Sequence, residues 1–92
     1  MEKNVLNYRI IIEKERYDDG SIVYTASCPT LGVYDYGETI EEVLTSITDG
    51  ITLAVETLAK EKKEIPLDRI DEQIITSTKI VVSPKISSSL SV

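Results

Sequence analysis

The chain has 92 residues, of which 41% are hydrophobic and 28% are charged, and its formal net charge is −6. This length allows one domain with a modest core, and the composition is too apolar for a disordered chain. The absence of His and the presence of a single Cys exclude an internal disulfide framework, zinc sites of the usual ligand sets and Ser-His-Asp or Cys-His catalysis.

The excess of acidic residues bears on the class of partner. A negative domain repels phosphate backbones, so direct binding to nucleic acid is not expected, whereas a basic protein would be attracted. Acidity that serves only solubility is an equally good interpretation. The first four residues lead into no long apolar run, which favours a cytoplasmic protein without a signal peptide or membrane span.

The first half of the chain predicts an antiparallel meander. Residues 7–16 contain a β-branched run typical of a strand, and Tyr17-Asp18-Asp19-Gly20 supplies a hairpin turn. In a second strand over 21–28, alternation places Ile22, Tyr24, Ala26 and Cys28 on one face and Val23, Thr25 and Ser27 on the other. Pro29 ends this strand, and residues 33–36 form a short third one.

One long amphipathic helix follows the meander. Thr39 is the expected N-cap, with Glu42 at the position that completes a capping box. Lysines gather near the expected end of the helix, and Pro66 stops any continuation. At 100° per residue, one apolar stripe contains Ile40, Val43, Leu44, Ile47, Ile51, Ala54, Val55 and Leu58.

The alternation from Ile74 to Val82 predicts a fourth strand, which Ser83-Pro84 ends. The tail over 83–92 is either a frayed end or a strand that adds to a partner's sheet edge. The expected fold is therefore α+β, with a three-stranded antiparallel meander, one helix packed on it and a fourth strand. We expect one domain over residues 1–82 and a tail over 83–92.

The residues that could take part in catalysis do not form the pattern of an active site. Asp18 and Asp19 suit turn geometry and Asp49 lies on the polar face of the helix, so a magnesium-dependent nuclease site is disfavoured. A buried Cys28 with no His to activate it is expected to be inert. No enzyme activity, metal or cofactor is therefore expected.

Exposed tyrosines are the more informative feature. Tyr24, Tyr34 and Tyr36 lie on adjacent predicted strands, where aromatic rings either stack nucleic acid bases, pack on the sheet or contact a protein. The acidic composition favours packing or a protein interface.

The stretch from Tyr8 to Pro66 resembles the N-terminal domain of HicB-family antitoxins. The resemblance rests on the order and spacing of several short segments: Tyr8 to Lys14, Asp18-Asp19-Gly20, Ile22-Val23-Tyr24, Cys28-Pro29-Thr30-Leu31-Gly32, Gly37 to Val43 and Glu64-Ile65-Pro66. The loop after Leu31 is shorter than the common Leu-Pro-Gly form of that family.

The resemblance implies a partial ribonuclease H-like fold and a function. Members of that family block a small basic mRNA-cleaving toxin, HicA, and assemble as dimers or tetramers, and many carry a C-terminal DNA-binding domain. Only 26 residues follow Pro66, with no second helix pattern, so we expect that domain to be absent. The expected function is toxin neutralisation, and the alternative is an orphan oligomerisation or adaptor domain. The expected contact residues are Glu13, Glu15, Asp18, Asp19, Tyr34, Asp35 and Tyr36.

Overall fold

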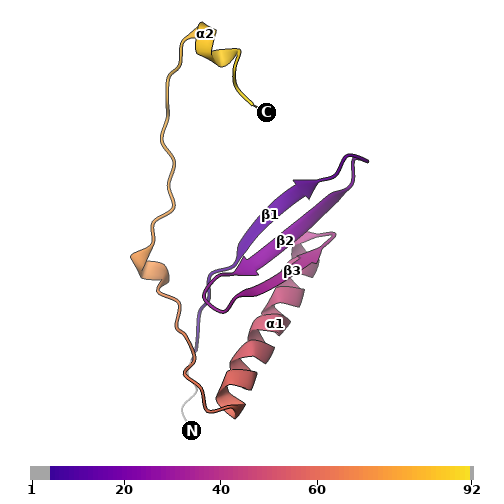
Figure 1. Ribbon diagram of the computed structural model, residues 1–92, viewed down its shortest axis with the longest axis vertical. Helices are drawn as coiled ribbons and strands as arrows, with labels where there is room; N and C mark the ends of the chain where they lie inside the picture. The colour runs from indigo at the N-terminus through magenta and orange to yellow at the C-terminus, as the bar shows by residue number, and fades with distance from the viewer. Residues whose placement is uncertain (1–4, 92) are drawn as a thin grey trace.

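The computed structural model describes residues 5–91 and has the predicted α+β fold. Three antiparallel strands are followed by one long helix, and the remaining chain leaves this body as an extended segment with two short helical turns (Figure 1). The elements are β1 (Ile11–Arg16), β2 (Ile22–Cys28), β3 (Val33–Gly37), α1 (Ile40–Lys60), the 3₁₀ turn η1 (Ile70–Glu72) and α2 (Pro84–Ser87).

The first hairpin forms where the sequence predicts it. The Gly20 N–H donates to the Tyr17 carbonyl at 2.9 Å, and Gly20 has a φ of +88°, a conformation that glycine adopts without steric cost. β1 pairs with β2 from Ile11 to Arg16, so the ladder begins four residues later than the predicted strand. β2 lies between β1 and β3.

Helix α1 begins at the predicted cap. The Glu42 N–H donates to Thr39 Oγ1 at 3.0 Å, and the Glu42 side chain accepts from the Glu38 N–H at 3.1 Å. The return bond thus reaches the residue before the N-cap, a variant of the usual capping box. These bonds fix the position at which the chain passes from β3 into the helix.

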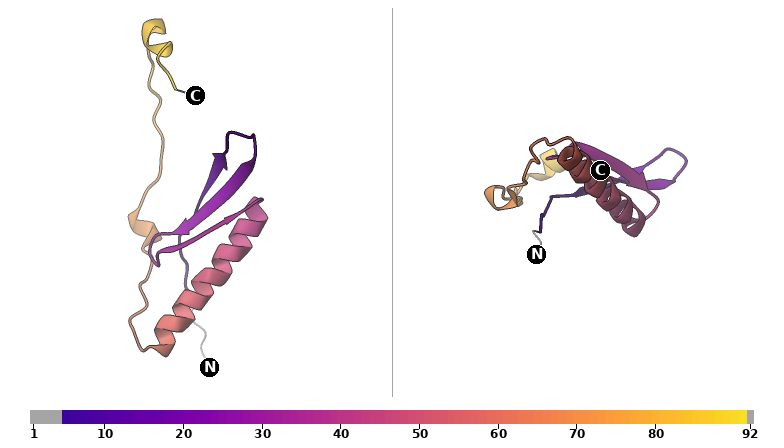
Figure 2. Two further views of the ribbon diagram at one scale, coloured as in Figure 1. Left: turned by 45° about the vertical axis from the view of Figure 1, so that its right-hand side comes forward. Right: turned by 90° about the horizontal axis from the view of Figure 1, so that it is seen from below.

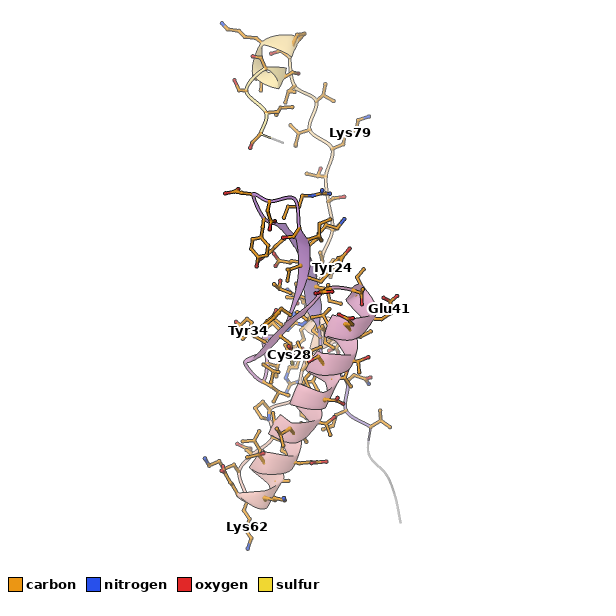
Figure 3. The ribbon with its side chains drawn as sticks, turned by 90° about the vertical axis from the view of Figure 1, so that its right-hand side faces the viewer. Tyr24, Cys28, Tyr34, Glu41, Lys62 and Lys79 are labelled. Atoms are coloured by element: carbon orange, nitrogen blue, oxygen red, sulfur yellow. The ribbon has the colours of Figure 1, made fainter. Side chains whose placement is uncertain are left out.

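The helix ends in a Schellman motif whose left-handed residue is not glycine. The Lys62 N–H donates to the Ala59 carbonyl at 3.1 Å, and the Lys63 N–H donates to the Leu58 carbonyl at 2.9 Å. Lys62 has a φ of +56° and lies at the free end of the helix (Figure 3). A side chain in this conformation costs free energy that glycine would avoid.

Helix α1 covers one face of the sheet and forms the core with it (Figure 2). The fully buried side chains are few: Ala26 and Cys28 from β2, and Val43 and Ile47 from α1. The helix packs mainly on β3 and β2, and its contact with β1 is slight. The predicted burial of Cys28, Val43 and Ile47 is therefore confirmed, whereas Ile40 and Leu44 of the predicted stripe are exposed. The β1 side of the inner face is thinly covered.

The chain after the helix is attached to the segment before β1. Tyr8 Oη donates to the Pro66 carbonyl at 2.7 Å, and the Arg9 N–H donates to Asp68 Oδ2 at 2.7 Å. Arg9 Nη2 also lies 3.1 Å from Asp68 Oδ1, and the Asp68 side chain is inaccessible to solvent. The backbone hydrogen bond from Arg9, with the guanidinium beside it, holds the pKa of Asp68 below its usual value.

The predicted fourth strand is not formed. Residues 73–82 are extended, but within the described chain their backbone has no hydrogen-bonded neighbour, and every residue from 69 to 91 is exposed. The alternating pattern was correct for extended backbone, but a strand also requires a partner strand, and the chain turns away from β1 at η1. The tail over 83–92 forms the short helix α2 in its described part, and not an additional strand.

Among residues 5–91, no helix combines the length and the apolar character that crossing a lipid bilayer requires.

Candidate functional site

The sheet has an outer face that α1 leaves uncovered, and most of the predicted contact residues lie there. The strand register sets two rows of side chains across this face. Thr25 of β2 pairs with Glu13 on one side and with Tyr36 on the other, and Ser27 pairs with Ile11 and Tyr34 in the same way. Small hydroxyl residues thus lie in the middle, between Glu13 and Ile11 at one edge and the two tyrosines at the other.

This arrangement leaves a hollow of about 560 Å³ on the outer face. Tyr34 and Tyr36 are 77% and 74% exposed, which is unusual for large aromatic side chains in so small a domain. Tyr34 projects from the side of the sheet opposite α1 (Figure 3). The residues that line the hollow are Ile11, Glu13, Glu15, Thr25, Ala26, Ser27, Tyr34, Asp35 and Tyr36.

Tyr24 is the exception among the tyrosines. Its position in β2 alternates with Thr25, so its side chain lies on the inner face, where it packs against the core. Although all three tyrosines lie on adjacent strands, Tyr24 therefore does not share the outer face with Tyr34 and Tyr36. Side chains alternate between the two faces of a strand, so the sequence already put Tyr24 and Thr25 on opposite faces. This signal excludes Tyr24 from the outer face.

Asp35 also points inward, although it borders the hollow. Its carboxylate accepts a short hydrogen bond from Ser46 Oγ of α1 and a second from the Tyr36 N–H at 2.9 Å. The Ser46 bond, followed by the backbone bond, lowers the pKa of Asp35. This carboxylate holds β3 against the helix and thereby positions the two tyrosines that flank it.

The two turn aspartates lie at the tip of the hairpin and do not line the hollow. Asp19 Oδ1 accepts from Ser21 Oγ at 2.6 Å and from the Ser21 N–H at 2.9 Å, and these bonds lower its pKa. Its observed role is therefore to close the turn. Asp18 is exposed beside it.

Sequence reasoning missed four residues that line the hollow: Ile11, Thr25, Ala26 and Ser27. The signal for two of them was available, because Thr25 and Ser27 had been assigned to the face opposite Cys28. Their importance is their small size, which makes room between the taller side chains. Among the described residues, no group of three or more Asp, Glu, Cys or His is placed to hold a metal ion.

A comparison with known proteins places this domain in a family. The UPF0150 protein ssr1765 of Synechocystis sp. is 40% identical over 65 residues, which are 70% of this chain and 77% of that protein. The chain belongs to the UPF0150 family. No family model matches this UPF0150 chain, and no solved structure matches it either.

Proposed function

We propose that this UPF0150 chain is a non-catalytic, antitoxin-like protein that binds and blocks a small basic, HicA-like mRNA-cleaving toxin. One observation carries the proposal beside the sequence resemblance to HicB antitoxins. Two glutamates and two exposed tyrosines face solvent together across the outer face of the sheet. The protein would act in the cytoplasm as a homodimer or homotetramer.

The chemistry of this face suits a basic protein surface. Carboxylates of Glu13 and Glu15 attract Lys and Arg side chains, and a guanidinium also stacks on tyrosine rings. Tyrosine gives a large contact area at low cost in side-chain entropy, which is why it is enriched at protein interfaces. The net charge of −6 adds long-range attraction to a basic partner.

A binding role needs no catalytic group on this chain, because inhibition follows from covering the toxin. An enzyme that cleaves RNA must expose a basic surface to its substrate, and an acidic protein competes for that surface. The hollow between the glutamates and the tyrosines has room for one or two long basic side chains.

The test uses the product of any reading frame beside this gene that encodes a small basic protein. The two purified proteins are mixed and analysed by size exclusion with light scattering, and RNA cleavage by the basic protein is followed as this chain is added. We expect a stable complex and complete loss of cleavage at the stoichiometric point. Full cleavage in the presence of excess chain would refute the proposal.

The second candidate is an orphan oligomerisation or adaptor domain without a toxin. The exposed apolar segment after η1 favours it, because such a segment suits self-association whether or not a toxin exists. The absence of a neighbouring reading frame for a small basic protein would favour this candidate.

A further inference from the structure

The segment over residues 74–82, hereafter the free strand, is extended and rich in apolar residues, and within residues 5–91 it pairs with no strand and lies outside the core. Ile74, Ile75, Ile80 and Val81 are between 72% and 87% exposed. Figure 1 shows the free strand running beside the sheet but clear of it, between η1 and α2. Exposed backbone donors and acceptors on an apolar strand favour pairing with another strand.

The chain as a whole is far from compact. Its accessible surface is 8148 Å², whereas a compact monomer of this mass exposes about 5,400 Å². Its radius of gyration is 18.5 Å, against about 12 Å for a compact domain of this length. The excess surface is about 2,800 Å², which reaches the upper end of what each subunit of an obligate dimer buries.

The edge of β1 in the folded body is a strand edge to which the free strand could add. Among the described residues this edge has no neighbouring strand, because the sheet order is β1-β2-β3. The inner face beside it is apolar and thinly covered, since α1 packs mainly on β3 and β2. Ile10, just before β1, and Ile12 of β1 are only partly buried against the core. On α1, Ile40 and Leu44 also remain 48% and 43% exposed.

We propose that the free strand of one copy adds to the β1 edge of a second copy, and that two chains exchange these strands in a symmetric dimer. The hinge is the stretch from Arg69 to Gln73, which includes η1 and directs the free strand away from its own β1. Exchange of one element between identical chains gives a closed two-fold assembly with two equal contacts.

The two faces of the free strand match the two faces of the sheet. Its even-numbered side chains carry no charge and cover the apolar inner side: Ile74, Thr76, Thr78, Ile80 and Val82. Its odd-numbered face carries Lys79 (labelled in Figure 3), which turns to the outer side, where β1 presents Glu13 and Glu15. In a parallel pairing with Ile75 beside Ile11, Lys79 falls opposite Glu15. In an antiparallel pairing with Val81 beside Ile11, it falls opposite Glu13.

The dimer is tested by the mass of the full chain in solution across a range of concentrations, with analytical ultracentrifugation. We expect a dimer for the native chain. Ile80→Asp places a charge on the inner side of both contacts and is expected to raise the dimer dissociation constant about a hundredfold or more. Ser88→Asp, outside the free strand, is the matched control and is expected to leave the dimer intact.

A second measurement covers the case in which the free strand folds back on its own sheet. Hydrogen exchange of the native chain is expected to show slow amide exchange over 74–82 at concentrations where the dimer forms, and fast exchange there in Ile80→Asp. A monomer, with or without protected amides in the free strand, would overturn the proposal, as would a dimer that Ile80→Asp leaves unchanged. These results do not depend on a toxin, so failure of the proposed function is separable from failure of the dimer.

Discussion

Packing between α1 and β3 fixes the position of the tyrosines, and Gly50 is one point at which the two elements approach closely. A Cβ at Gly50 would lie 3.1 Å from Val33 Cγ1, closer than ordinary contact between carbon atoms. Val33 is β-branched and stiff, so either its side chain or the strand must give by a few tenths of an ångström. Gly50→Ala therefore combines two opposing effects.

The magnitudes decide the sign. Replacing Gly by Ala inside a helix gains about 1 kcal/mol of stability, and overpacking of a filled site costs about 1–3 kcal/mol. The native chain should lose roughly 0–2 kcal/mol in its free energy of unfolding on Gly50→Ala. In a Val33→Ala background Cγ1 is absent, so the same change should stabilise the protein by about 1 kcal/mol.

Urea unfolding of the four proteins, at one protein concentration and followed by circular dichroism, closes this double-mutant cycle. The expected coupling between the two positions is about 1–3 kcal/mol. An equal gain from Gly50→Ala in both backgrounds would show that α1 does not approach β3 as closely as described.

Three further predictions follow from the caps, the core and the carboxylates. Lys62→Gly removes the steric cost of the left-handed conformation and should raise the free energy of unfolding by about 1 kcal/mol. Lys60→Gly, within the helix, should lower it by about as much. Urea midpoints that shift in the same direction in both variants would contradict this assignment of the helix cap. The Cys28 thiol is fully buried, so a thiol reagent should label the native chain at least a hundredfold more slowly than the urea-unfolded chain, and comparable rates would place Cys28 outside the core. The pKa of Asp68 is lowered in the folded state, so its stabilising contribution is complete above its unfolded pKa near pH 4 and is lost as pH falls through its folded pKa. Asp68→Asn should therefore flatten the fall of the urea midpoint with pH below pH 4. An unchanged dependence of the midpoint on pH would refute this assignment.

The sequence predicted local structure well because local rules determined it. Asp19-Gly20 marks the hairpin and Thr39 marks the start of the helix, since each is set by a hydrogen bond to a residue close by in the chain. The alternation in β2 also separated Cys28 from Ser27 correctly. These features need no knowledge of the rest of the fold.

The errors concern residues whose role depends on a distant partner. Asp35 was expected to face a partner protein, but Ser46, eleven residues later, binds it from the helix. The fourth strand was expected from its pattern alone, and in the part of the chain that the structure describes it pairs with no strand. A sequence pattern shows which backbone conformation a segment favours but not whether a neighbour is within reach.

Binding of a basic partner by the outer face is the central claim, and charge reversal on that face tests it most directly. Isothermal titration of the neighbouring small basic protein would compare the native chain with Glu13→Lys/Glu15→Lys. The matched control is Glu56→Lys/Glu64→Lys, which changes the net charge equally, on exposed residues outside the outer face. We predict that the outer-face pair weakens binding at least tenfold more than the control pair. Equal weakening by both pairs, or none by the outer-face pair, would contradict the assignment of this face.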